Sequence, residues 1–281
     1  MKKIDFHCHA TKRKINDVIP ESADINYLAK EMQKYEIEKT VLLATYFPHK
    51  SSGISNYRLY HWIKDRPEFV MFGSLDFEHY FYQGYNELEE MAEERLIKGI
   101  KIYTCYQNID LSSKNFGRII SLAKKQNLPV MFHGGYSYTS FRRYGRFSVA
   151  NLIHPKDLEF LAKEHPTLKI IISHLGNPFH QELTEIVKEN SQVYSDISGL
   201  VHSKYKRDPR YEPEEVSEAV ENIKQFLGEC GPSKLLFGTD FPLQIHSDSI
   251  YFIEEAMKNY PLTDKKKVYY KNAERILEGR D

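Results

Sequence analysis

The stretch LKIIISHLGNPFHQELTEIVKENSQVYSDISG, residues 168–199, contains a complete strand–helix–strand unit. Two apolar, β-branched runs, Leu168–His174 and Gln192–Ile197, predict buried strands. Between them, Gln181–Glu189 has apolar residues three and four positions apart, which is typical of an amphipathic helix. The unit therefore predicts two neighbouring parallel strands that are joined by a helix covering the sheet.

The same alternation recurs along the rest of the chain. The expected strands are Lys3–Cys8, Thr40–Phe47, Phe69–Leu75, Gly99–Thr104, Pro129–His133, Leu168–His174, Gln192–Ile197 and Lys234–Asp240. The expected helices are Asp24–Tyr35, Tyr85–Leu96, Gly117–Gln126, Pro155–Glu164, Gln181–Glu189 and Pro213–Leu227, with Ser249–Asn259 and Asp264–Glu278 at the end of the chain. About eight such units in about 250 residues predict a (β/α)₈ TIM barrel with additional C-terminal helices. No GxGxxG or P-loop motif follows a strand, which disfavours an open nucleotide-binding sheet. We expect a single domain over residues 1–281.

The amino-acid composition disfavours nucleic acids and membranes as binding partners. The 281 residues include 39 Lys and Arg and 39 Asp and Glu, so the formal net charge is zero. Proteins that bind nucleic acid or anionic membranes by charge usually carry a cationic excess, and neither partner is expected. The mean hydropathy is −0.56, and the sequence has no apolar run of the ~18 residues that a membrane-spanning helix needs. We expect a soluble protein that acts on a small molecule.

The cysteines indicate a reducing compartment. Cys8, Cys105 and Cys230 are an odd number without CxxC spacing, which disfavours both a disulfide framework and a structural zinc site. The opening residues MKKIDFHCHA lack the apolar run of a secretory signal. The sequence therefore predicts a cytoplasmic protein.

Ionisable residues stand at the ends of several expected strands, where TIM barrels carry their catalytic groups. The first strand ends in IDFHCH, residues 4–9. Strand alternation predicts that Asp5, His7 and His9 share one face and point into the barrel. An HxH spacing alone is weak support for a metal site, because a sequence with 12 histidines produces such pairs by chance.

Three later strands strengthen the metal-site hypothesis. His133, His174 and Asp240 each follow an apolar run and stand just before a turn. Any one of them could be a structural residue, but together they bring several imidazoles and one carboxylate to one end of the barrel. This donor set is typical of catalytic zinc, which lowers the pKa of a bound water to about 7.

The sequence resembles the amidohydrolase superfamily, specifically the amidohydrolase 2 branch of metal-dependent TIM-barrel lactonases, hydratases and non-oxidative decarboxylases. The resemblance rests on IDFHCH, KGIKIY, LPVMFHGG, HPTLKIIISHLG, VYSDISG, LLFGTDFP and NAERIL, which occur in this order almost from end to end. It implies that His7, His9, His133 and Asp240 are metal ligands and that Asp240 also accepts a proton. It implies that His174 polarises the substrate or takes a second metal.

The resemblance implies one divalent metal ion, with zinc as the first expectation and manganese or iron as the alternatives. A second metal would be bridged by a carboxylated lysine on the fourth strand, as in other branches of the superfamily. We instead expect Lys101 to contact a substrate carboxylate or to be a buried cation. The competing interpretation pairs Lys101 with an interior acid such as Asp5.

A basic segment follows the strand of His133. Arg142, Arg143 and Arg146 suit bidentate binding of a substrate carboxylate, although such a segment can also be a solvated surface. Asp196 is expected to support the site or the fold. Three further histidines, His49, His202 and His246, follow expected strands and could line the cavity or lie on the surface.

Three functions compete at this stage. The first is a hydrolase that directs a metal-activated water at an ester, lactone or amide of a small, carboxylate-bearing substrate. The second is a non-oxidative decarboxylase or hydratase that acts on an aromatic or unsaturated acid in the same metal site. The third is a non-catalytic metal-binding barrel. Similar proteins are commonly dimers, so a homodimer is expected.

Overall fold

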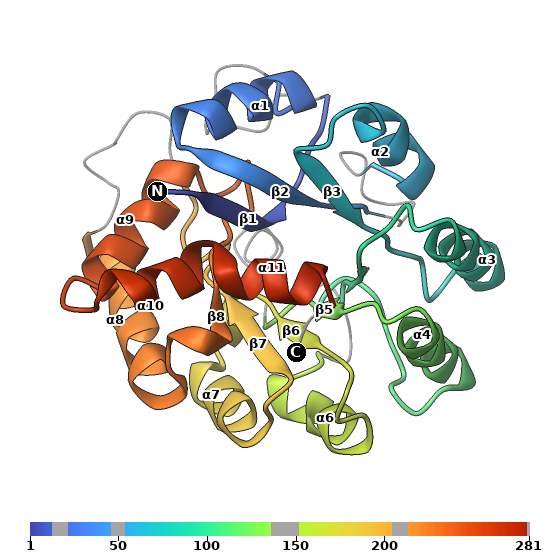
Figure 1. Cartoon of the computed structure of the whole chain (residues 1–281). Coiled ribbons are helices and arrows are strands. Elements are labelled where there is room, and N and C mark those ends of the chain that lie inside the picture. Colours follow the sequence, from blue (N-terminus) through green and yellow to red (C-terminus); the bar gives the residue numbers. More distant parts are fainter. Residues whose placement is uncertain (13–21, 46–53, 136–151, 204–212, 280–281) are drawn as a thin grey trace.

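Eight parallel strands form a ring at the centre of the fold (Figure 1). The computed structural model describes residues 1–12, 22–45, 54–135, 152–203 and 213–279. The strands are β1 (Lys3–Cys8), β2 (Ile37–Leu43), β3 (Phe69–Phe72), β4 (Ile100–Ile102), β5 (Val130–Phe132), β6 (Ile170–Ile172), β7 (Val193–Asp196) and β8 (Leu235–Leu236). They pair in sequence order as two parallel sheets, β1-β2-β3 and β4-β5-β6-β7-β8.

Backbone contacts join the two sheets at both of their edges. Between β3 and β4, Gly73 pairs with Ile100, and the N–H of Lys101 donates to the carbonyl of Gly73 at 2.7 Å. Between β8 and β1, Cys8 pairs with Phe241. On the same edge, the N–H of Phe6 donates to the carbonyl of Phe237 at 2.9 Å, and that of Asp240 to the carbonyl of His7 at 2.7 Å. The ring is thus closed, and the fold is the (β/α)₈ TIM barrel that the sequence predicted.

Helices surround the strand ring (Figure 1). They are α1 (Ile25–Lys34), α2 (Asn56–Ile63), α3 (Phe81–Glu93), α4 (Lys114–Lys125), α6 (Glu159–Glu164), α7 (His180–Glu189), α8 (Pro213–Cys230), α9 (His246–Ala256), α10 (Leu262–Lys266) and α11 (Asn272–Leu277). Short 3₁₀ turns occur at Pro155–Leu158, His174–Gly176 and Pro232–Lys234, and a π-helical turn, Lys267–Lys271, joins α10 to α11. α1 begins where it does because the carboxylate of Asp24 accepts the N–H groups of Asn26 and Tyr27.

Apolar side chains fill the barrel and close one end of it. Ile4, Phe6, Val41, Leu43, Phe72, Met131, Ile171, Tyr194, Leu236, Ala273 and Ile276 form one buried cluster. The strands contribute all of these except Ala273 and Ile276, which lie on α11. Figure 1 shows α11 lying across the strand ring at the end where the strands begin. We call this end, formed by the cluster above, the floor of the barrel.

The observed elements differ from the predicted ones in several respects, and β2, for example, covers Ile37–Leu43 instead of beginning at Thr40. The eighth strand is shorter than the expected Lys234–Asp240, because the chain beyond Leu236 makes irregular hydrogen bonds to β1. The sequence did not predict α2, whose buried Leu59 and Ile63 give only one helical repeat. The expected helix Asp264–Glu278 is interrupted by the π-helical turn.

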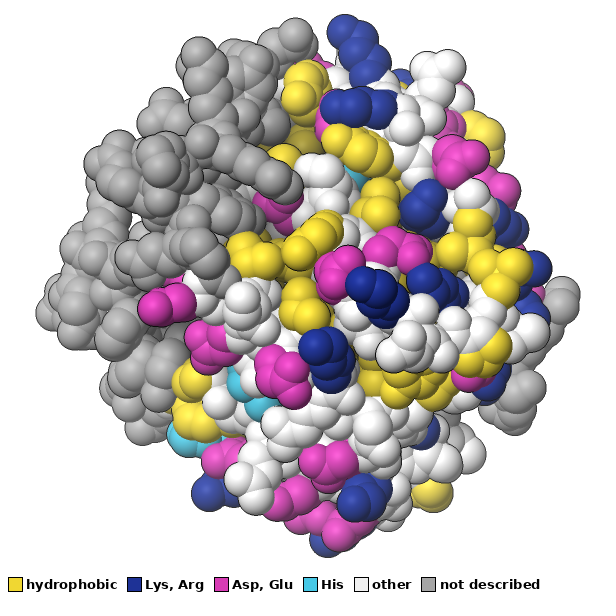
Figure 2. Space-filling model, turned by 90° about the vertical axis from the view of Figure 1, so that its left-hand side faces the viewer, with side chains coloured by type: hydrophobic (Ala, Val, Ile, Leu, Met, Phe, Trp, Pro, Cys, Tyr) yellow, Lys and Arg dark blue, Asp and Glu magenta, His cyan; other side chains and the backbone are white. Residues whose placement is uncertain are grey.

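Charge is mixed on the side of the barrel formed by α8, α9 and α10. In the described part of this face, Figure 2 shows basic and acidic side chains interspersed, as the zero net charge suggests. Lys265 pairs with Glu254, and Lys267 with Asp264 at 2.7 Å. Among the residues described, none of the helices is long and apolar enough to cross a membrane.

Candidate metal centre and active site

Two histidines from β1 meet one aspartate from the segment after β8. His7 lies near the end of β1, His9 follows it, and Asp240 comes four residues after β8. The Nε2 atoms of His7 and His9 lie 3.4 and 3.2 Å from the same oxygen, Oδ1 of Asp240. His7 is 1% exposed and His9 22% exposed, so the group lies at the boundary between the buried interior and solvent.

The spacing of these three side chains fits a metal ion. Ligand atoms bound to one tetrahedral zinc at about 2.0–2.1 Å lie about 3.3 Å apart. The two observed separations are close to this value, and all three candidate ligand atoms lie within 4.8 Å of one another. Two imidazole nitrogens and one carboxylate oxygen are also donors that zinc prefers. His7, His9 and Asp240 are therefore suited to hold a divalent metal.

His174 lies next to His7, and His133 lies next to His174. His133 directly follows β5, and His174 stands two residues after β6. Nε2 of His174 is 3.2 Å from Nδ1 of His133, and the rings of His174 and His7 have centroids 4.8 Å apart. The structure thus brings together all five residues that the sequence assigned to metal binding and catalysis.

Asp196, at the end of β7, supports two of these histidines. Its Oδ2 lies 3.0 Å from Nδ1 of His7, and its Oδ1 accepts the backbone N–H of His174 at 3.0 Å. Oδ1 also accepts the hydroxyl of Ser198, whose Oγ lies 3.0 Å from Nδ1 of His7 and 2.9 Å from Nδ1 of His174. A carboxylate behind a ligating histidine orients the ring and raises its basicity, as in other metal sites.

The hydrogen bonds place one proton on each of two rings. Nδ1 of His7 faces the carboxylate of Asp196, so this nitrogen carries a proton, and Nε2 is the nitrogen that faces Asp240. Nδ1 of His174 lies 2.8 Å from the carbonyl oxygen of Ser198, which can only accept. In the neutral ring of His174 the lone pair is therefore on Nε2, which faces Nδ1 of His133 at 3.2 Å.

Burial and neighbouring charges shift the pKa values of the site. Burial disfavours the ionised Asp240, but hydrogen bonds and charges of His7 and His9 outweigh it and hold its pKa well below the usual value. Burial, together with the nearby His7, lowers the pKa of His174 to about 4. At neutral pH, Asp240 is thus an anion and His174 a neutral base.

The backbone is strained at two site residues. Asp240 and His174 have φ angles of +61° and +62°, in the left-handed region that non-glycine residues rarely adopt. Gly199, with a φ of +60°, passes between their side chains. A Cβ atom at Gly199 would lie 2.9 Å from both Oδ2 of Asp240 and Nδ1 of His174, so the site has room only for glycine there.

Lys101, on β4, is buried between the metal centre and the apolar interior. Its Nζ donates to Oγ of Ser173 at 3.1 Å and lies 5.4 Å from the centroid of the Tyr103 ring. Burial lowers the pKa of Lys101 to about 8, although the charges of Asp196 and Asp240 oppose the shift. The prediction of a buried cation agrees with this position.

Asp5 does not take the position that strand alternation predicted. The register of β1 against β2 shifts between Asp5 and Cys8, so the alternation of faces is broken there. Asp5 accepts a hydrogen bond from Cys8 Sγ at 2.9 Å and lies 3.3 Å from Nε2 of His246. It therefore lies behind the site, and the expected sharing of one face with His7 is wrong. The proposed pairing of Lys101 with Asp5 is also not observed, since Asp5 contacts His246 instead.

The remaining site predictions have different outcomes. His246 is fully buried beside Asp5, so it does not line the cavity. His202 is partly exposed in the segment after β7. The residues Arg142, Arg143, Arg146 and His49 lie outside the described residues.

Three residues near the histidines were not predicted from the sequence to belong to the site. Ser198 could have been found, because it stands two positions after Asp196 at a strand end. Tyr103 and Tyr106 lie against the site, with ring centroids 6.4 Å from His9 and 5.3 Å from His133, respectively. Both follow the short strand β4, but nothing in their spacing separates them from the many other tyrosines of the chain.

A closed TIM barrel with this set of histidines and one aspartate at its strand ends defines the class of metal-dependent barrel hydrolases and decarboxylases. The chain belongs to the amidohydrolase family, since the family model described as Amidohydrolase matches residues 4–279. This membership confirms the resemblance drawn from the sequence. No curated protein matches the chain.

Several solved structures have the same fold. An amidohydrolase from Burkholderia multivorans with bound zinc has a TM-score of 0.71 at 14% identity, covering 99% of both chains. A probable 2-pyrone-4,6-dicarboxylic acid hydrolase from Acinetobacter baumannii has a TM-score of 0.69 at 16% identity, covering 99% of this chain and 100% of the other. A 2,6-dihydroxybenzoate decarboxylase from Rhizobium has a TM-score of 0.66 at 14% identity, covering 98% of both. At these identities the likeness establishes the fold.

Proposed function

We propose that this protein is a zinc-dependent hydrolase that cleaves an ester, lactone or amide bond in a small, carboxylate-bearing molecule. The observation that carries the proposal is the convergence of His7 and His9 on one oxygen of Asp240, with Asp196 behind His7. In the proposed ligand set, His133 completes the site. When bound, the metal lowers the pKa of water and polarises the scissile carbonyl.

The ionised Asp240 and the neutral His174 divide the proton transfers. Asp240 accepts a proton from the attacking water while the water oxygen bonds to the carbonyl carbon. Asp240 then gives that proton to the leaving oxygen or nitrogen as the bond between this atom and the carbonyl carbon breaks. The lone pair on Nε2 of His174 provides a second proton acceptor beside Asp240. Transfer of the second proton of the attacking water to Nε2 makes His174 a hydrogen-bond donor to the developing oxyanion, and His174 releases this proton to solvent after the products leave.

Substrate binding is assigned to basic side chains. Arg142, Arg143 and Arg146 are proposed to bind the substrate carboxylate, because guanidinium groups pair with carboxylates through two hydrogen bonds. Lys101 is proposed to act as a buried cation beneath the site. Replacing it with glutamine would test this role, since loss of a direct substrate contact raises KM whereas loss of a buried charge lowers kcat.

A carboxy-lyase is the second candidate. The observation that favours it is the pair of tyrosine rings, Tyr103 and Tyr106, beside His9 and His133, which would suit an aromatic acid. The Rhizobium neighbour is a decarboxylase of such an acid. In this reaction a proton replaces the carboxylate on carbon, and Asp240 or His174 would have to deliver it.

A substrate panel separates the two reactions. The zinc-loaded protein is assayed for ring opening of 2-pyrone-4,6-dicarboxylate and simpler lactones, for cleavage of aryl esters, and for carbon dioxide release from 2,6-dihydroxybenzoate. We expect hydrolysis without carbon dioxide release. Carbon dioxide release with no hydrolysis would overturn the proposal in favour of the lyase.

The metal set has its own test. His9→Gln should lose zinc during dialysis against a mild chelator, whereas His61→Gln should retain it. His61 is the matched control because it lies exposed on α2, with its ring against that of Tyr60 at a centroid distance of 6.1 Å. If both variants kept one zinc per chain, His9 would not be a ligand.

Two further proposals concern the setting of the protein. We propose a cytoplasmic location, which is supported by the three free cysteines. We also propose a homodimer. Cell fractionation and light scattering of the purified protein test these proposals, and a monomer at micromolar concentration would contradict the second.

A further inference from the structure

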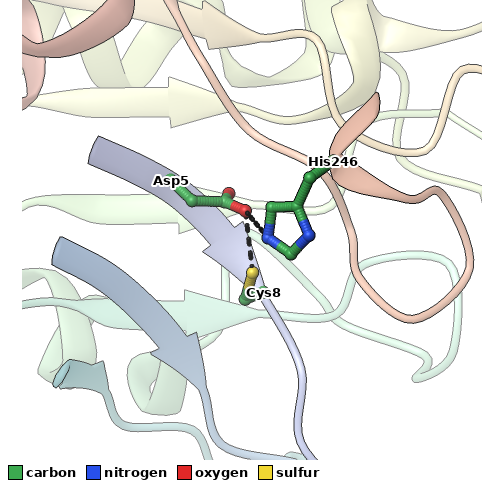
Figure 3. A group of neighbouring side chains, drawn as sticks. All are labelled: Asp5, Cys8 and His246. Carbon is green, nitrogen blue, oxygen red and sulfur yellow. Dashed lines mark hydrogen bonds and ion pairs between the residues drawn. The ribbon is translucent and has the colours of Figure 1, made fainter. Parts of the chain in front are cut away.

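A buried carboxylate, that of Asp5, lies directly behind the metal centre. Asp5 is on β1, two residues before His7, and its side chain is fully buried. Figure 3 shows its carboxylate directed toward Cys8 on the same strand and toward His246 at the start of α9. The reaction proposed above does not use this group.

The carboxylate of Asp5 binds the backbone of both strand ends that carry the metal ligands. Its Oδ1 accepts the N–H of His7 at 3.2 Å and the N–H of Thr239 at 3.0 Å. Its Oδ2 accepts the hydroxyl of Thr239 at 2.7 Å. Because Thr239 directly precedes Asp240, one carboxylate fixes the end of β1 relative to the segment that follows β8.

The outer side of Asp5 is sealed from solvent. Sγ of Cys8 donates to Oδ2 at 2.9 Å, and Nε2 of His246 lies 3.3 Å from the same oxygen. His246 is fully buried and packs between the rings of Tyr35 and Phe241, with centroids 5.7 and 5.3 Å away. Hydrogen bonds to a carboxylate are stronger where water is excluded, so the burial of Asp5 by Cys8 and His246 strengthens its hydrogen bonds to His7 and Thr239.

The geometry of this cluster disfavours a second metal site. Asp5, Cys8 and His246 have potential ligand atoms within 4.8 Å of one another. The Sγ atom of Cys8 is nevertheless only 2.9 Å from Oδ2 of Asp5, whereas sulfur and oxygen ligands of one zinc would lie about 3.5 Å apart. In addition, each Asp5 oxygen already accepts hydrogen bonds from Thr239.

We propose that Asp5 is a positioning residue that sets the spacing between the histidines of β1 and Asp240. This inference rests on the proposed metal ligand set. Without the carboxylate, the N–H groups of His7 and Thr239 lose a shared acceptor, and the separations of 3.4 and 3.2 Å to Asp240 are no longer fixed. Residues that orient metal ligands typically change metal affinity 10- to 100-fold when they are replaced.

The test compares Asp5→Ala with Asp5→Asn in the full-length protein. The amide oxygen of asparagine can still accept both N–H groups, whereas alanine accepts neither. We expect Asp5→Ala to weaken zinc binding about 10- to 100-fold and to lower kcat with little change in KM, and Asp5→Asn to restore both to within about 3-fold of the wild type. Zinc affinity is measured by competition with a chromophoric chelator at a temperature where thermal unfolding shows the variant to be folded.

Two further variants keep the proposal testable. Thr239→Val loses one donor to Asp5, retains the backbone N–H and should weaken zinc binding in the same direction, so it serves if Asp5→Ala does not fold. Cys8→Ala is the matched control, because Cys8 is equally buried and its Sγ contacts Asp5 and Thr239, but it binds neither of the backbone N–H groups that Asp5 accepts. It should bind one zinc with wild-type affinity.

The outcomes separate this inference from the proposed function. If the wild-type protein binds one zinc, and the folded Asp5→Ala and Thr239→Val variants bind it with the same affinity, the positioning role alone is overturned. A wild-type protein that binds no zinc would overturn the proposed function and, with it, this role. A third outcome is that each chain binds two zinc ions, and that the cobalt-substituted protein shows a thiolate-to-cobalt absorption band that is lost in Cys8→Ala. This outcome would identify the cluster of Asp5, Cys8 and His246 as a metal site instead.

Discussion

The two ends of the barrel differ in chemistry. At the end where the strands finish, buried ionisable side chains meet, and Asp240 and His174 have strained backbone angles. At the floor, apolar strand residues pack against Ala273 and Ile276 of α11. The comparison teaches that one end of the barrel supports the reaction and the opposite end supports the fold, so variants at the two ends should fail in different assays.

The largest expected effect is at the site. Asp240→Asn should lower kcat by about 10³-fold or more, because the amide cannot accept the proton of the attacking water. Steady-state kinetics on the metal-loaded variant check this prediction. A wild-type rate with one zinc bound would remove Asp240 from the mechanism.

The next effect is at the floor. Ile276→Ala should lower the free energy of unfolding by about 2–5 kcal/mol, because it removes a buried side chain and leaves a cavity. The kcat of the folded protein should stay within about 3-fold of the wild type. Leu262→Ala, at a position on α10 that is 58% exposed, is the control and should change stability by about 0.5 kcal/mol at most. Lost activity with unchanged stability would contradict the separation of the two ends.

A smaller effect on activity is expected at Gly199, where the site has no room for a side chain. Gly199→Ala should lower kcat by about 100-fold, since the added methyl group displaces Asp240 and His174. A methyl group added at Gly228, on α8, would meet no neighbouring atom within 4 Å, so Gly228→Ala is the matched control with wild-type kinetics. Equal kinetics for the two variants would show that the contacts at Gly199 do not constrain the catalytic side chains.

The smallest effect is on the outside of the barrel. Oγ of Ser113 accepts the N–H of Phe116 at 3.1 Å and caps α4. Ser113→Ala should cost about 1 kcal/mol of stability and leave kcat and KM unchanged. Thermal unfolding and kinetics check this prediction. A change in KM would mean that the helix ring influences the site more than the comparison allows.

Much of the barrel and of the candidate site could be predicted from the sequence. Parallel strands between helices appear as short apolar runs, and the ring that they form places their ends together. His133, His174 and Asp240 could therefore be grouped although more than 100 residues separate the first from the last. This inference needed only the position of each residue at a strand end.

The contacts behind the site could not be predicted in the same way. The irregular register of β1 turns Asp5 away from the face that alternation assigns to it, and a period of two residues cannot show such an irregularity. The contact of Asp5 with His246 joins residues 241 positions apart in the chain and depends on how α9 packs against β1.

The closure of the ring between β1 and β8 has a consequence for synthesis on the ribosome. The segment that carries Asp240 is made more than 200 residues after His7 and His9, and α11 is made later still. Until then, the edge of β1 that pairs with residues 237–241 has no partner, and the floor is open. A nascent chain therefore exposes an unpaired strand edge and apolar surface over this whole interval, when protection by a chaperone would matter most.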